Sequence, residues 1–153
     1  MPDRLLILFL LLVPGGCTPS STVSHDPGTV LKAVNGNHLT DLDSLLAAGA
    51  DANSVNQDGI TALMLAVRAG HKVIIERLIE AGANVNASTP SERTALHDTA
   101  DWGDLSIAAM LLEAGAEIEA RDGAGMTPLN RAAWKKKPQL MAFLSEQGAE
   151  ACT

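Results

Sequence analysis

The sequence predicts an all-α solenoid of four stacked helix-turn-helix units, and three recurring elements lead to this prediction. A Gly-Ala pair recurs every 33 residues, as Gly49-Ala50, Gly82-Ala83, Gly115-Ala116 and Gly148-Ala149. Threonine keeps the same spacing at Thr61, Thr94 and Thr127. Leucine does so at Leu45, Leu78, Leu111 and Leu144. A fixed period of this length is typical of repeat proteins, in which each unit buries its apolar face against its neighbours.

Each unit is expected to begin with a short helix that starts after the recurring threonine. A threonine hydroxyl can accept a hydrogen bond from a free N–H of the first helical turn. Pro128 stands where a missing N–H costs least. Gly70 and Gly103 follow this helix, where a left-handed residue can end it.

A second, amphipathic helix then follows, because apolar residues recur at helical spacing, as in Val73, Ile74, Leu78 and Ile79. Asp58-Gly59 and Asp122-Gly123 supply turn residues between units. The sequence therefore predicts a unit of turn, helix, turn, helix and loop.

The two terminal units depart from this pattern. In the first, Gly28 replaces the capping threonine and Asn37, which tolerates the left-handed conformation, replaces the glycine between the helices. In the last, Lys136 occupies that glycine position and Ser145 replaces an apolar residue. A polar outer face is what a terminal repeat needs for solubility.

Two consecutive units resemble the ankyrin repeat. One contains Gly59-Ile-Thr-Ala-Leu63, Gly70-His71 and Ala81-Gly-Ala-Asn-Val-Asn86, and the next contains Thr94-Ala-Leu-His97, Gly103 and Leu111-Leu-Glu-Ala-Gly-Ala116. The resemblance covers about residues 27 to 153. It implies an ankyrin-repeat solenoid over residues 29–153, with approximate units 29–56, 57–89, 90–122 and 123–153. It also implies a structural hydrogen bond for His97.

The amino terminus is expected to direct export. Arg4 precedes nine apolar residues, too few to span a bilayer, and residues 1–16 fit a secretory signal peptide. Gly15-Gly16-Cys17 resembles the lipobox of bacterial lipoproteins, which implies a lipid on Cys17 as the first mature residue, although Pro14 departs from that motif. Plain export is the alternative. Residues 17–28 are polar and predicted to be a flexible tether.

This reading places the domain on the periplasmic side of a bacterial envelope, with the outer membrane favoured because Thr18 follows the cysteine. A membrane would be touched only through the lipid. Cys152 is the one other cysteine, and it is either an incidental tail residue or a reactive or partner-linking thiol. With plain export, Cys17 carries no lipid, and a disulfide bond between Cys17 and Cys152 is a further alternative.

The sequence gives no reason to expect an enzyme. It contains no phosphate-binding glycine loop and no serine nucleophile motif, and we expect no catalytic residues, metal or cofactor. His38 and His71 occupy the same place in successive units, about 10 Å apart, too far to share a metal ion. A net charge of -7 argues against a nucleic-acid partner.

The resemblance implies instead a monomer that recognises a protein, since ankyrin partners meet the inter-unit turns and the ends of the first helices. These positions predict a partner-binding set of Ile60, Arg68, Arg93, Asp101, Trp102, Met126, Trp134 and Lys135. Ile60 and Met126 are expected to be exposed at turn tips. Each tryptophan belongs to a binding face or covers the neighbouring unit, and Lys135-Lys136-Lys137 are solvated or contact an acidic region of a partner.

The function that follows is an exported protein–protein interaction module. Small exported ankyrin proteins resembling this one act as immunity or inhibitor proteins against a toxic enzyme, or in oxidative stress. The alternative is an envelope scaffold or stress-associated lipoprotein with no inhibitory role.

Overall fold

The structure is a computed structural model that describes residues 26–102 and 104–150. This part of the chain forms eight helices and contains no strand, which confirms the predicted all-α solenoid. The helices are α2 (Pro27–Asn35), α3 (Leu39–Ala47), α4 (Ala62–Ala69), α5 (Lys72–Glu80), α6 (Ala95–Trp102), α7 (Leu105–Glu113), α8 (Pro128–Trp134) and α9 (Pro138–Glu146).

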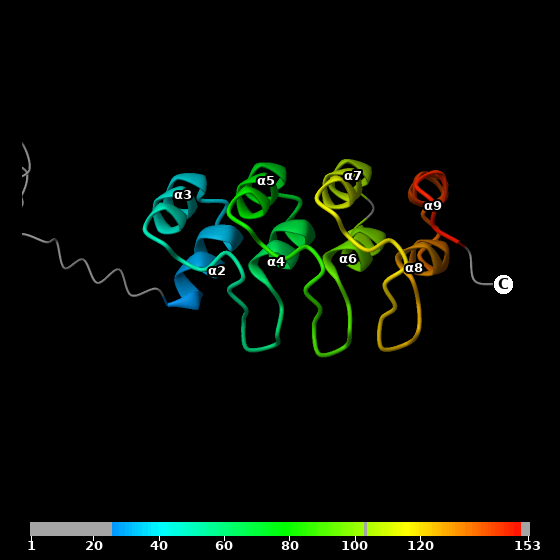
Figure 1. Ribbon diagram of the computed structural model, residues 1–153, viewed down its shortest axis with the longest axis horizontal. Helices are drawn as coiled ribbons and strands as arrows, with labels where there is room; N and C mark the ends of the chain where they lie inside the picture. Colours follow the sequence, from blue (N-terminus) through cyan, green and yellow to red (C-terminus); the bar gives the residue numbers. More distant parts are fainter. Residues whose placement is uncertain (1–25, 103, 151–153) are drawn as a thin grey trace, which may run out of the picture.

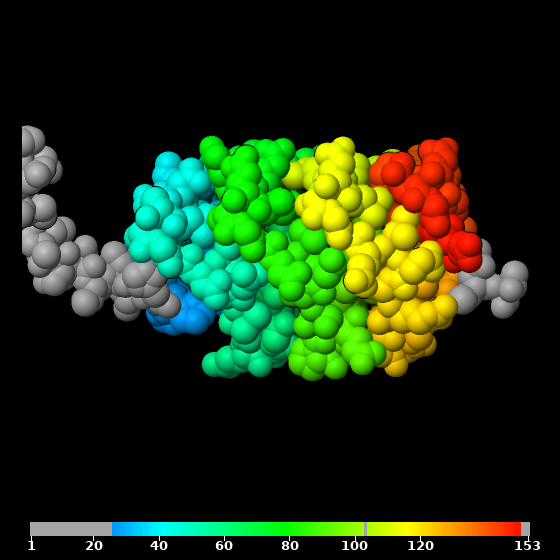
Figure 2. All heavy atoms as spheres, in the orientation of Figure 1, coloured from blue at the N-terminus to red at the C-terminus, as the bar shows by residue number. Residues whose placement is uncertain are grey.

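The helices form two layers, with one helix of every unit in each layer (Figure 1). We call α2, α4, α6 and α8, with the hairpin that precedes each of the last three and the turns that follow α2, α4 and α8, the inner layer. Helices α3, α5, α7 and α9, with the loops that follow them, form the outer layer. Each inner helix packs against the next one along the stack, and the successive units touch along its whole length (Figure 2).

The predicted helix ends are confirmed at several positions. The hydroxyl of Thr61 accepts a hydrogen bond from the N–H of Met64 at 3.2 Å, and that of Thr127 accepts one from Asn130 at 3.3 Å. Gly70 ends α4 in the left-handed conformation, with φ 74°. A β-carbon disfavours this conformation, so glycine lowers its cost there.

The core lies between the layers and runs through all four units. Its large fully buried side chains are Leu42, Leu63, Met64, Ile74, Ile75, Leu78, Leu96, Ile107, Leu111, Leu140 and Leu144. The expected pattern differs in α5, where Ile75 is buried and Val73 is 52% exposed. The buried side of α5 therefore carries Ile74, Ile75 and Leu78, and Val73 lies on roughly the opposite side of the helix.

One of the predicted boundaries needs correction. Helix α2 begins at Pro27, so residues 27 and 28 are helical and do not belong to a tether that reaches residue 28. Asp26 caps this helix by accepting from the N–H of Gly28 at 3.2 Å, and Pro27 fits because the first helical residue needs no N–H partner. In the last hairpin, Gly125 is the left-handed glycine, at φ 74°.

The hairpins that link the units project side by side from one edge of the stack (Figures 1 and 2). Each is held by its first side chain: Asn56, Thr89 and Asp122 accept hydrogen bonds from N–H groups within their own hairpins. Neighbouring hairpins also touch, since the N–H of Gly123 donates to the carbonyl oxygen of Ser91 at 2.8 Å. The hairpins thus form a continuous, internally bonded edge beside the inner helices.

Candidate functional site: the inner face of the third and fourth units

The ends of α6 and α8 bring together four side chains that we call the tryptophan patch: Asp101, Trp102, Trp134 and Lys135. In the 33-residue register, Asp101 corresponds to Trp134 and Trp102 corresponds to Lys135. The four residues therefore occupy two equivalent positions on two adjacent helices. The patch therefore lies at the same end of two neighbouring inner helices.

Two contacts of Lys135 connect three of these residues. The Nζ atom of Lys135 lies 3.3 Å from Oδ1 of Asp101, which joins the third and fourth units. The same Nζ atom lies 4.9 Å from the centre of the Trp134 ring, a favourable cation–π distance. Trp102 and Trp134 are 60% and 67% exposed. Most of each indole therefore faces solvent, and neither ring is a core side chain.

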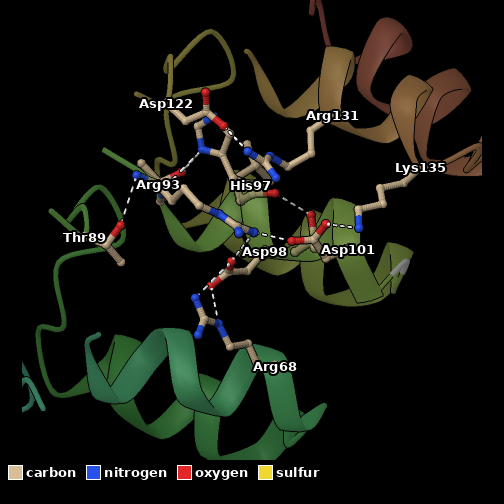
Figure 3. A network of polar contacts seen from close by, with 12 residues as sticks. Arg68, Thr89, Arg93, His97, Asp98, Asp101, Asp122, Arg131 and Lys135 are labelled. Atoms are coloured by element: carbon tan, nitrogen blue, oxygen red, sulfur yellow. Dashed lines mark hydrogen bonds and ion pairs between the residues drawn. The ribbon is translucent and has the colours of Figure 1, made fainter. Parts of the chain in front are cut away.

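Beneath the patch lies a charged network centred on Asp98, whose side chain is only 1% exposed (Figure 3). One carboxylate oxygen of Asp98 accepts from Nε of Arg68 at 2.9 Å, and the other from Nη2 of Arg93 at 2.8 Å. Arg93 also pairs with Asp101, which in turn contacts Lys135. The network thus connects α4, the hairpin before α6, α6 itself and the end of α8, and it reaches the tryptophan patch.

A second buried pair lies nearer the hairpins. Asp122 and Arg131 form an ion pair, and the Asp122 side chain is 1% exposed. Burial would raise the pKa of Asp122, but the hydrogen bond from Arg131 and those from the Met126 and Ala124 N–H groups outweigh it and lower that pKa. The pKa of Asp101 is likewise lowered, since its bonds to Arg93 and Lys135 outweigh the effect of burial. Both carboxylates are therefore held in their charged form.

His97 is fully buried and links a helix start to the next hairpin (Figure 3). Its Nε2 atom lies 3.0 Å from the Met126 carbonyl oxygen, which can only accept, so Nε2 carries the ring proton. Nδ1 then accepts from the Thr94 N–H at 3.2 Å and from the Thr94 hydroxyl at 2.9 Å. These bonds are the structural role that the resemblance implied for His97.

The buried imidazole leads to a prediction about pH. Burial lowers the pKa of His97 below its ordinary value of 6.5, although the Met126 carbonyl and Asp122 act in the opposite direction. His97 therefore binds a proton more readily in the unfolded chain than in the folded protein. The contribution of the neutral imidazole to the free energy of unfolding is fully present above pH 6.5 and is lost as the pH drops towards the folded-state pKa. In His97→Asn this part of the pH dependence should disappear in urea titrations between neutral and mildly acidic pH.

Asparagine is a suitable replacement because Asn130 occupies the same register position in the fourth unit. If the variant kept the parent's pH dependence over that interval, the loss of stability would have to come from another group.

The predicted binding residues divide into two groups. Arg68, Arg93, Asp101 and Lys135 belong to the charged network or the patch, together with both tryptophans. Ile60 and Met126 differ from expectation: both are half-buried, and Ile60 packs against the core. The expectation that both residues would be exposed at the turn tips was therefore wrong. In the case of Ile60, the side chain is directed towards the core and not towards solvent.

Sequence reasoning missed Asp98, Asp122 and Arg131. A signal existed, because Asp98 stands in register with Leu65 of the second unit and Arg131 of the fourth. A carboxylate at a position where a neighbouring unit has leucine suggests a buried charge that needs a partner. The partners could not be read from spacing, since Arg68 and Arg93 lie 30 and 5 residues from Asp98.

Two further searches cover the described part of the chain only. Residues 26–102 and 104–150 include no group of three or more His, Cys, Asp or Glu side chains placed to hold a metal ion. Over the same residues, no helix has the length and apolar character needed to cross a membrane.

The fold defines a helical repeat protein, and its inner layer carries two exposed tryptophans. A family model described as Ankyrin repeats (3 copies) matches residues 30–122, more than half of the chain. The chain therefore belongs to the ankyrin-repeat family, whose repeats are protein–protein interaction modules. No curated protein matches the chain at a significant level.

Proposed function

We propose that this protein captures a protein partner with its tryptophan patch. The observation that carries the proposal is the exposure of Trp102 and Trp134, the two largest exposed apolar side chains among the described residues. Tryptophan and arginine dominate the energetics of protein interfaces. The charged network holds Asp101 and Lys135 in place before binding, which reduces the entropy lost on association.

Replacing both tryptophans should abolish capture of the partner. Each Trp→Ala change at an interface centre costs about 2 kcal/mol or more, so Trp102→Ala with Trp134→Ala should weaken binding by about a thousandfold. The measurement is recovery of proteins from envelope extracts on C-terminally tagged protein, followed by titration of the purified partner. A stoichiometric partner lost only in the double variant is the expected result.

Val73→Ala provides a matched control, because Val73 is also an exposed apolar residue but lies on outer helix α5. It should bind like the parent chain. Equal recovery of the same proteins by the parent and a folded double variant would contradict the proposed function.

The proposed location is the periplasmic side of a bacterial envelope, with the protein held by a lipid on Cys17. This residue lies outside the described part of the chain, and the support comes from the signal-peptide-like residues 1–16 and the following cysteine. Cys17→Ser should lose metabolic labelling with a palmitate analogue. It should also move the protein from the membrane fraction to the soluble fraction. A labelled Cys17→Ser variant would contradict lipidation at this position.

The finer form of the proposal is that the partner is a toxic enzyme and that binding inhibits it. A small domain that presents two exposed tryptophans at the ends of neighbouring helices is suited to covering a catalytic cleft. The test is the partner's activity at saturating concentrations of this protein. Full activity in the saturated complex would favour an envelope scaffold, the alternative role.

A further inference from the structure

The charges of the protein are divided unevenly between its two layers. The inner-layer residues 27–37, 56–70, 89–102 and 122–137 contain seven Lys or Arg and five Asp or Glu. The outer-layer residues 38–55, 71–88, 104–121 and 138–150 contain three Lys or Arg and eleven Asp or Glu. The chain as a whole has a net charge of -7, but its inner layer has a net positive charge.

The positive charge of the inner layer gathers at its last unit. Residues 127–137, which comprise α8 and the turn after it, contain Arg131, Lys135, Lys136 and Lys137 but no Asp or Glu. The carboxylates that pair with this segment are Asp101, which contacts Arg93 and Lys135, and Asp122, which contacts Arg131. Lys136 and Lys137 form no ion pair with any residue that the structure describes. Their charge is available to a partner.

Lys136 also has an unusual backbone conformation. Its φ is 56°, in the left-handed region, and its side chain is exposed. At the same turn of the second unit stands Gly70, and at that of the first stands Asn37, both residue types that tolerate this conformation. Lysine is therefore the least stable choice among the three. Local backbone strain of this kind is found most often at functional sites.

From these observations we propose that the tryptophan patch, with Lys136 and Lys137 at its edge, binds an acidic segment of the partner protein that also carries an apolar side chain. The apolar side chain would lie against Trp102 and Trp134, and the carboxylates against Lys136 and Lys137. Lys135 is committed to Asp101 and Trp134, so it holds the patch together. This inference rests on the proposed function and names the chemistry of its partner.

A protein segment fits this surface better than a flat anionic membrane does. The basic cluster is confined to one unit, whereas the chain as a whole carries a net charge of -7. At physiological salt, charges act over about 8 Å, so a local cluster can attract a narrow acidic segment. A membrane surface would also approach the acidic outer layer and the hairpin carboxylates Asp58 and Glu92, which would repel it.

Two indole N–H signals make the test specific, because the chain contains only Trp102 and Trp134. The full-length protein as processed in the cell is labelled with nitrogen-15, and the two indole signals are recorded by nuclear magnetic resonance. Single Trp→Phe variants assign each signal to its residue. The probe is a soluble ten-residue peptide of glutamate and leucine, and its control has every glutamate replaced by glutamine. Both indole signals should shift with the glutamate peptide, and affinity should fall several-fold as salt is raised.

Lys136→Gly separates binding from stability. Removing one unpaired charge at the edge should weaken binding of the glutamate peptide by about three- to tenfold, in the range of charge contributions across interfaces. The melting temperature should stay equal to that of the parent or rise, because glycine relieves the left-handed strain. Asn37→Gly is the matched control: it changes the same turn in the first unit and should leave peptide binding unchanged.

The outcomes distinguish this inference from the proposed function. Equal shifts with the glutamine peptide, no shift at millimolar glutamate peptide, or unchanged binding in Lys136→Gly would overturn the acidic-segment proposal. Shifts with vesicles of phosphatidylglycerol and phosphatidylcholine, but not with the peptide, would replace it with membrane binding. In each of these cases, loss of the captured partner in the double tryptophan variant would still support the proposed function.

Discussion

Leu111→Ala is expected to lower the free energy of unfolding by about 2 to 5 kcal/mol, the range for a leucine removed from a closely packed core. Leu111 is fully buried in α7, the outer-layer helix of the third unit, which has a neighbouring unit on each side (Figure 1). Because each unit is stabilised mainly by its neighbours, the cavity weakens the contacts to both of them. Urea unfolding of the parent and variant measures the difference.

Leu45→Ala is the matched control, since Leu45 holds the same register position in the first unit but is only half-buried. No described unit precedes it, so less apolar surface is lost and the effect should be clearly smaller. Equal losses at Leu45 and Leu111 would contradict the view that inter-unit packing supplies the stability.

Asp98→Ala should destabilise the fold by about 2 to 3 kcal/mol, because it leaves two arginines without their buried acceptor. Removing one partner of a fully buried ion pair costs about 3 to 5 kcal/mol, and the smaller value is expected here because water can reach part of each arginine. The side chains of Arg68 and Arg93 are 29% and 25% exposed. The measurement is again denaturant unfolding.

A double-mutant cycle makes this prediction specific to the network. Arg68→Ala should cost less in the Asp98→Ala background than in the parent chain, because the bond between the two residues is already lost. Additive effects would mean that Asp98 stabilises the fold through contacts other than this ion pair. Asp98→Ala should also disturb the tryptophan patch, because Arg93 would lose one of the two carboxylates that it pairs with and keep only Asp101.

The repeat register predicted the fold because it records local chemistry that every unit must satisfy. Thr61 and Thr127 cap helices and Gly70 ends one, as expected from their residue types alone. The start of the first helix was misplaced because Gly28 was aligned with the threonine caps, whereas Asp26 and Pro27 provide an equivalent start slightly earlier.

The site was predicted less completely. The exposed tryptophans could be located, since the register fixes which residues stand at helix ends. The network around Asp98 could not, because it depends on how side chains from α4, a hairpin and α6 converge after the units stack. Ile60 was assigned to solvent for the same reason: its position in a turn was clear, but the direction of its side chain was not.

The hydrogen bonds between neighbouring units bear on how the protein could be lengthened by adding repeats. The side chains of Asn53, Asn86 and Glu119 accept from the N–H groups of Asn84, Glu117 and Glu150, and each bond spans 31 residues. Each links one unit only to the next. Duplication of a complete 33-residue block would therefore reproduce these bonds without altering the core. The stack could thus be lengthened by whole units, while the third and fourth units at its end kept the tryptophan patch.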